Sequence, residues 1–201
     1  LMNQTALTIT TINVPLFLEG LCQNINDHGH VNDTTIIIIA DKKTPSGAEV
    51  YCQNTAKKYK IDLDYLDIET QEYRLKEYTD LLNLFPYNTP DRVILGGMLS
   101  YIYGCERLIA VDDDNYSTEN DFVGFHNITG SEIELNLINN ESGWFNVHNA
   151  LVEEQNIPFY PRGYPWEQRN SKSNERFDIK KVGKVVVNQG LVLEDPDIDA
   201  I

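Results

Sequence analysis

The sequence predicts an α/β fold in which helices cover both faces of a doubly wound, mostly parallel sheet. Segments typical of strands alternate four times with segments typical of helices within the first 121 residues. Right-handed crossovers between parallel strands place helices on both faces of such a sheet. Residues 34–40 form an unbroken and largely β-branched run, which is typical of a strand buried on both faces.

Four strands are expected in this half of the chain. Residues 6–12 and 34–40 are apolar and β-branched, and residues that favour turns follow each of them. Residues 61–66 and 106–111 are the third and fourth expected strands, and the fourth leads directly into the polar segment 112–115.

Helices are expected between these strands. Leu16, Phe17, Leu21 and Ile25 recur at helical spacing after the first strand. The other expected helices are residues 48–58, 70–84 and 91–103, the last of which is interrupted by Gly96-Gly97.

The alternation of strands and helices ends near residue 122. Beyond it the sequence predicts short strands at 122–125, 132–138 and 184–188, with turns between them. We therefore expect one domain, in which residues 1–121 form the α/β half and residues 122–201 form a β-rich lid or extension.

The composition argues against several classes of function. The chain has 201 residues and a net charge of −15, whereas binding to nucleic acid or to an anionic membrane needs a cationic face. No stretch approaches the roughly 20 apolar residues of a membrane span, and the first residues lack the pattern of a secretory signal. The three cysteines have no CxxC spacing, which favours a reducing compartment. We therefore expect a cytoplasmic protein that binds neither nucleic acid nor membrane.

Asp112, Asp113 and Asp114 are the strongest local sign of a site. Three adjacent carboxylates repel one another, and a divalent cation such as Mg²⁺ or Mn²⁺ offsets that repulsion. On an extended backbone Asp112 and Asp114 point the same way and can bind one cation together, which leaves coordination sites for a diphosphate. The alternative is a solvated loop that caps the next helix.

Two further polar groups follow expected strands, namely Asn13 after the first and Asp41 after the second. In doubly wound sheets, ligands bind beyond the carboxyl ends of the strands, where the strand order reverses. The sequence therefore predicts a ligand site formed by these two residues together with the acidic triplet.

A second cluster combines aromatic residues, prolines and two arginines within residues 159–169. A guanidinium group offers a planar fork of donors, so Arg162 and Arg169 suit a departing diphosphate; alternatively, they pair with surplus carboxylates. Near the end of the chain, Asp197 and Asp199 could supply a metal ligand or a base, although by themselves these residues favour an exposed acidic tail.

Other conspicuous side chains are expected to be structural. His28 and His30 follow the first helix, where polar or cationic side chains suit the helix dipole. Cys22, Cys52 and Cys105 lie on apolar stretches and are expected to be buried. The chain contains neither a P-loop nor a dinucleotide-binding glycine motif.

Several of these motifs, taken in order, resemble a known family. The motifs are Thr10-Thr11-Ile12-Asn13, Asp41, the triplet 112–114, the loop 161–165 with Arg169, and residues 190–200. Together they resemble the reversibly glycosylated polypeptides, which are UDP-arabinopyranose mutases and relatives of the GT-A glycosyltransferases. The loop 161–165, of sequence proline, arginine, glycine, tyrosine and proline, is the most specific of these motifs.

The resemblance implies a GT-A-like fold and a site for a nucleotide sugar. The residues it assigns to nucleotide binding are Thr10, Thr11, Asn13, Asp41 and Asp113, and those it assigns to the metal and diphosphate are Asp112 and Asp114. Residues 1–121 would then be the nucleotide-binding half, and residues 122–201 the lid and acceptor side. Because the family continues beyond the position of Ile201, we expect a further C-terminal portion.

The same resemblance assigns catalytic roles to Arg162 and Arg169, and Asp197 and Asp199 are further catalytic candidates because their carboxylates could supply a base. Arg162 matches the arginine that carries the sugar in that family, and Arg169 matches its essential neighbour. A guanidinium with a pKa above about 12 is a poor nucleophile, so we expect Arg162 to act as an electrostatic clamp on the departing diphosphate.

These observations predict a metal-dependent glycosyltransferase that cleaves the bond between the sugar and the diphosphate of a UDP-sugar. The alternatives are a mutase that interconverts pyranose and furanose forms, and a non-catalytic subunit that only binds the nucleotide sugar. The expected ligands are Mn²⁺ or Mg²⁺, a UDP-sugar and a sugar or glycan acceptor whose identity is open, as is assembly into a homo-oligomer.

Overall fold

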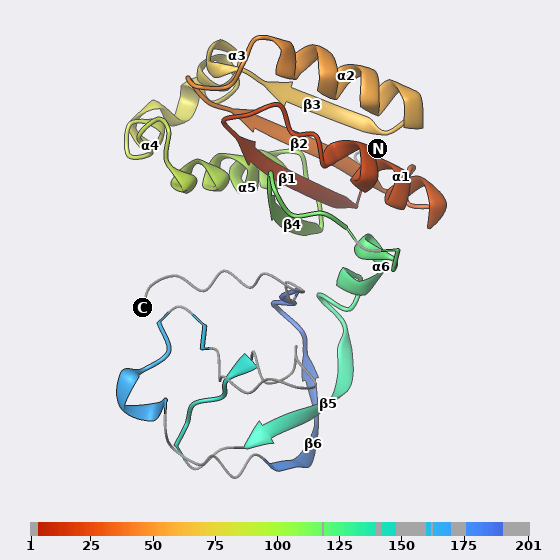
Figure 1. Ribbon diagram of the computed structural model, residues 1–201, viewed down its shortest axis with the longest axis vertical. Coiled ribbons are helices and arrows are strands. Elements are labelled where there is room, and N and C mark those ends of the chain that lie inside the picture. The colour runs from red at the N-terminus through yellow and green to blue at the C-terminus, as the bar shows by residue number, and fades with distance from the viewer. Residues whose placement is uncertain are drawn as a thin grey trace. The chain divides into compact units, whose positions relative to one another are not determined.

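The computed structural model describes residues 4–117, 119–139, 142–147, 160–161, 163–169 and 176–190. Its contacts divide the chain into two compact units, Leu1–His126 and Asn127–Ile201. Each unit has its own sheet, with four strands in the first and two in the second (Figure 1). Among the described residues, no helix is both long and apolar enough to cross a membrane.

The first unit contains a parallel sheet of the predicted class. Its strands are β1 (Thr5–Thr11), β2 (Thr34–Ala40), β3 (Asp62–Leu66) and β4 (Arg107–Asp112). They lie in the order β3-β2-β1-β4, and every neighbouring pair is parallel (Figure 1). The chain adds β2 and β3 on one side of β1 and then returns to add β4 on the other, so the strand order reverses between β1 and β4.

The β2 strand shows why a β-branched run forms the middle of such a sheet. Successive side chains of a strand point to opposite faces. Ile36 and Ile38 therefore enter one buried cluster, and Ile37 and Ile39 enter another. All seven residues of β2 are buried, which confirms the prediction of a strand covered on both faces.

Helices cover the two faces of this sheet. The cluster around Ile36 includes residues of α1 (Leu18–Asp27), α2 (Gly47–Tyr59) and α6 (Phe122–His126), whereas the cluster around Ile37 includes residues of α5 (Val93–Ile102). Cys22 and Cys52 are fully buried in the first cluster, as predicted, and Cys105 is half-buried.

Close contact between α5 and β1 depends on a glycine. A Cβ atom at Gly96 would lie 2.7 Å from Cβ of Thr8, a distance that side chains do not adopt. At the next residue, Gly97, the nearest atom to such a Cβ would be Cδ2 of Leu108 at 3.3 Å. The sequence interruption at Gly96-Gly97 therefore marks a close approach of helix to sheet, and the helix continues through it.

The prediction of one continuous helix over residues 70–84 is wrong. The structure has α3 (Ile68–Arg74), the 3₁₀ turn η1 (Lys76–Tyr78) and α4 (Thr79–Leu82). Asp67 caps α3 by accepting a hydrogen bond from the Thr70 amide at 2.8 Å. Leu75 is fully buried, but residues 76–80 are all exposed, so no buried side chain in this stretch holds one continuous helix against the sheet. Contact with the core resumes at Leu82.

Two of the short strands predicted beyond residue 121 are also wrong. Residues 122–125 belong to α6, because Val123 packs into the core and Asp121 accepts a hydrogen bond from the Gly124 amide. The second unit contains β5 (Glu132–Asn139), as predicted, paired antiparallel with β6 (Arg176–Lys184). Residues 185–188 lie beyond β6, with Val186 and Val187 largely exposed.

His30 contacts both the residue before α6 and the turn that precedes β2. Its Nε2 lies 2.9 Å from Oδ1 of Asp121, and its Nδ1 lies 3.2 Å from Oδ2 of Asp33. Because carboxylates only accept hydrogen bonds, both ring nitrogens act as donors when His30 is protonated. Burial lowers the pKa of His30, but the bonds to Asp121 and Asp33 outweigh it, so the pKa lies above its ordinary value of 6.5. His30 is structural, as the sequence predicted.

We expect the contribution of His30 to stability to fall as the pH rises. A group whose pKa is higher in the folded state stabilises that state fully below its unfolded pKa of about 6.5, and this stabilisation disappears as the pH passes the folded pKa. Urea unfolding of the wild type and of His30→Gln between about pH 6 and pH 9 measures it. A difference in the free energy of unfolding that stays constant over this range would contradict the expectation.

Candidate functional site

A cavity of about 340 Å³ opens at the carboxyl ends of β1, β2 and β4. This volume lies in the range of cavities that bind small molecules. The lining comes from four segments: residues 10–12, Ile39 with Asp41, residues 88–90 with Arg92, and the triplet 112–114. The cavity thus spans the point between β1 and β4 where the strand order reverses, which is where doubly wound sheets bind ligands.

Thr11 joins the end of β1 to the acidic triplet. Its hydroxyl donates a hydrogen bond to Oδ2 of Asp113 at 2.5 Å and accepts one from the Asn13 amide at 3.0 Å. The side-chain amide of Asn13 lies 3.5 Å from the same carboxylate oxygen. Asp113 is therefore directed toward the end of β1. These contacts bring Thr11, Asn13 and Asp113 together at the carboxyl end of β1.

Asp112 and Asp114 do not share an extended backbone, contrary to the geometry expected for them. The β4 strand ends at Asp112, and residues 113 and 114 form a turn in which the Asn115 amide lies 3.3 Å from the Asp112 carbonyl oxygen. The turn follows because β4 no longer has a partner beyond the pair Thr10 and Asp112. All three aspartates nevertheless line the cavity, since the turn folds the triplet over the end of β1.

The donor set of the triplet is of the kind that Mg²⁺ and Mn²⁺ prefer. Among the described residues, no group of three or more histidine, cysteine or acidic side chains is arranged to hold a metal ion. Mg²⁺ is usually held by one or two carboxylates, with the remaining ligands supplied by water and by the phosphates of the substrate. Asp112 and Asp114 are carboxylates of the kind that such a site uses, and both line the cavity.

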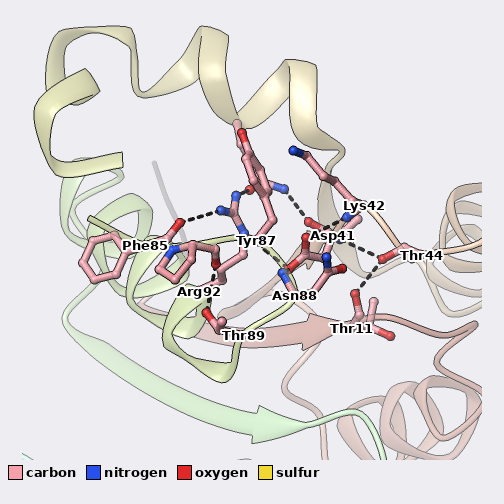
Figure 2. A network of polar contacts seen from close by, with 12 residues as sticks. Thr11, Asp41, Lys42, Thr44, Phe85, Tyr87, Asn88, Thr89 and Arg92 are labelled. Atoms are coloured by element: carbon pink, nitrogen blue, oxygen red, sulfur yellow. Dashed lines mark hydrogen bonds and ion pairs between the residues drawn. The ribbon is translucent and has the colours of Figure 1, made fainter. Parts of the chain in front are cut away.

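Asp41 anchors the opposite wall of the cavity and is buried, with 9% of its surface exposed. Its Oδ1 accepts a hydrogen bond from the Lys42 amide and its Oδ2 accepts one from the Asn88 amide, both at 2.6 Å (Figure 2). The Asp41 amide donates to the Thr44 hydroxyl at 2.7 Å, and that hydroxyl donates to the Thr11 carbonyl at 2.6 Å. The ends of β1 and β2 are therefore held together beside the cavity.

The wall formed by residues 88–92 was missed by the sequence analysis. Prolines 86 and 90 indicated only a break between helices, and Arg92 fell inside the expected helix 91–103. In the structure, Pro90–Arg92 form the 3₁₀ turn η2, and Arg92 is buried beside the cavity. The sequence signals this wall only through Pro90, which starts the turn, and Arg92, which ends it. Neither residue by itself indicates a binding wall.

The remaining predicted residues that the structure describes belong to both units. Thr10 lines it, whereas Asn13 contacts it through Asp113. Arg169 belongs to the second unit, where its guanidinium lies over the rings of Trp166 at 4.6 Å and Tyr160 at 5.5 Å.

Three predicted catalytic residues, Arg162, Asp197 and Asp199, lie outside the described residues. Comparison of the chain with models of protein families and with curated proteins finds no match. The function must therefore be argued from the geometry of the cavity.

Proposed function

We propose that this protein binds a nucleotide sugar, with UDP as the nucleotide, and cleaves the bond between the sugar and the diphosphate as a glycosyltransferase does. The supporting observation is the cavity at the reversal of strand order, because it gathers Thr10, Thr11, Asp41 and the triplet 112–114. These segments lie far apart in the sequence, and each lies at the carboxyl end of a different strand or directly after it. The resemblance to the reversibly glycosylated polypeptides assigned the same residues to the nucleotide and metal.

The charge of the cavity determines how such a ligand would bind. Four carboxylates line it, those of Asp41 and the triplet, against the single guanidinium of Arg92 within the described lining. A diphosphate is itself anionic, so it can approach the triplet only with a cation that reverses the local field. Mn²⁺ or Mg²⁺ would be held by Asp112 and Asp114 and would stabilise negative charge on the departing diphosphate.

The side chains of the two walls suit different parts of the ligand. The wall with Asp41 and residues 88–92 presents donors and acceptors suited to a nucleoside, and the wall with the triplet presents carboxylates suited to the metal. We assign Arg162 and Arg169 to the diphosphate, as the resemblance implies. The three cysteines are free thiols, which supports a cytoplasmic location.

Calorimetric titration tests this proposal. UDP and several UDP-sugars are titrated into the chain with Mn²⁺ and, separately, with a chelator. We expect binding that depends on Mn²⁺, because the triplet repels an unneutralised diphosphate. Equal affinity in the chelator would refute the role of the metal, and absence of UDP binding in both conditions would refute the nucleotide site.

Analysis of the products then distinguishes the type of reaction. Transfer or hydrolysis of the sugar supports the glycosyltransferase. Interconversion of the pyranose and furanose forms of UDP-arabinose without an acceptor indicates a mutase. Binding without either reaction indicates a nucleotide-sugar-binding subunit.

A further inference from the structure

Arg92 is a buried cation beside an acidic cavity, with 3% of its surface exposed. Its Nη2 donates a hydrogen bond to Oε1 of Gln71, and its Nη1 donates one to the Phe85 carbonyl at 3.2 Å. Its Nε lies 3.7 Å from Oδ2 of Asp41 and makes no hydrogen bond with any described residue. The guanidinium also lies 4.5 Å from the centre of the Tyr87 ring (Figure 2).

Gln71 connects this arginine to the sheet. Its side-chain amide donates hydrogen bonds to the carbonyl oxygens of Ala40 at 2.7 Å and of Leu66 at 2.8 Å. Those carbonyls belong to the last residues of β2 and β3. Because Gln71 is itself fully buried, Arg92 is held in a fixed place relative to the ends of two strands.

Asp41 connects the same arginine to the wall of the cavity. The carboxylate is buried and would be costly to desolvate without a nearby cation. Its Oδ2 faces Arg92 and also accepts the hydrogen bond of the Asn88 amide. Asn88 has a φ of 57°, in the left-handed region that residues other than glycine rarely adopt. Asparagine tolerates this region better than most residues, and the hydrogen bond to Asp41 holds Asn88 in it.

We propose that Arg92 is a positioning residue for this cavity, acting through Asp41 on Asn88 and its neighbour Thr89. Its guanidinium orients the Asp41 carboxylate, and that carboxylate holds the backbone of Asn88 through its hydrogen bond to the Asn88 amide. The part of this proposal that concerns ligand affinity rests on the proposed function, whereas the part that concerns the wall does not. The planar guanidinium donates hydrogen bonds to two acceptors while its Nε faces the Asp41 carboxylate, an arrangement that a lysine ammonium on a flexible stem cannot reproduce.

Amide hydrogen exchange of Asn88, followed by NMR without any ligand, tests the structural part. In Arg92→Lys we expect the Asn88 amide to exchange at least about 10-fold faster, since its hydrogen bond to a charged acceptor is weakened. Arg74→Lys is the matched control, because Arg74 pairs with Asp64 at 3.4 Å on a more exposed surface away from the cavity lining. Circular dichroism shows whether each variant folds, and Asp41→Asn provides a second route if Arg92→Lys does not.

Binding measurements test how Arg92 acts on the ligand. In saturating Mn²⁺ we expect Arg92→Lys to weaken UDP binding on the order of 10-fold, the usual effect of losing a residue that orients a binding residue. The affinity for Mn²⁺ alone, measured by electron paramagnetic resonance, should stay unchanged. A purely structural defect would weaken both affinities together.

Three results would overturn the positioning role of Arg92. The first is Asn88 exchange that is the same in Arg92→Lys as in the wild type. The second is weaker UDP binding with unchanged Asn88 exchange, which would place Arg92 in direct contact with the ligand. The third is an equal loss of UDP and Mn²⁺ affinity. If the wild type binds no UDP, the proposed function fails, yet the exchange experiment still decides whether Arg92 holds the wall.

Discussion

Replacement of Asp114 by asparagine is expected to weaken Mn²⁺-dependent binding of UDP by about 10-fold or more, or about 1.4 kcal/mol. Asp114 lines the cavity from the turn after β4, and an amide in place of its carboxylate removes a negative charge and an anionic ligand from the metal site. The fold should be unaffected, because Asp114 is exposed. Calorimetric titration with UDP at several Mn²⁺ concentrations measures the change.

One control variant and one further variant of the triplet test whether this effect is specific. Asp80→Asn removes one negative charge from an exposed position on α4, outside the cavity lining, and is expected to leave UDP affinity unchanged. Asp112→Asn is expected to act in the same direction as Asp114→Asn. Wild-type affinity in Asp114→Asn, or an equal loss in Asp80→Asn, would show that the triplet does not form a specific metal site.

Gly96→Ala is expected to destabilise the fold by roughly 1–3 kcal/mol, the usual cost of forcing an extra methyl group into a packed core. The new Cβ would lie 2.7 Å from Cβ of Thr8, and Thr8 is buried in the sheet, so neither atom has room to move. This clash outweighs the gain of up to about 1 kcal/mol that alanine gives over glycine in a helix. Urea unfolding followed by circular dichroism measures the change in the free energy of unfolding.

Gly97→Ala is the matched control for that substitution. It adds the same methyl group to the same helix, but the nearest atom, Cδ2 of Leu108, is 3.3 Å away on a half-exposed and flexible side chain. We expect the stability of Gly97→Ala to equal or exceed that of the wild type. If Gly96→Ala is as stable as Gly97→Ala, α5 does not approach β1 as closely as the structure describes.

The parts of the fold that the sequence predicted are those with a strong local signal. The β2 strand has its predicted limits, because a run of buried β-branched residues lies between turn-forming segments. The chain from 68 to 82 carries helix-forming residues throughout, but Leu75 is buried while the next residues are exposed, and burial cannot be read from local composition. Likewise, residues 122–125 combine aromatic and β-branched residues, yet a cap from Asp121 and the burial of Val123 make them helical.

The candidate site was predictable where it depends on strand ends. Parallel strands end at one edge of the sheet, so Asp41 and the triplet could be grouped before their distances were known. Arg92 could not, because its place depends on Gln71 and Asp41, which are distant in sequence. The turn at residues 113–114 was also beyond local inference, since the end of β4 depends on where its pairing with β1 stops.

The pairing of β1 with β4 has a consequence for biosynthesis. Thr5 lies opposite Arg107, so one edge of β1 remains uncovered until the ribosome has released the β4 segment far downstream. Long-range parallel pairing forms slowly, and an uncovered strand edge is a template for other nascent chains. During translation, β1 and the isoleucine-rich β2 are therefore synthesised before β4 is available to pair with β1. Aggregation competes with folding at this stage.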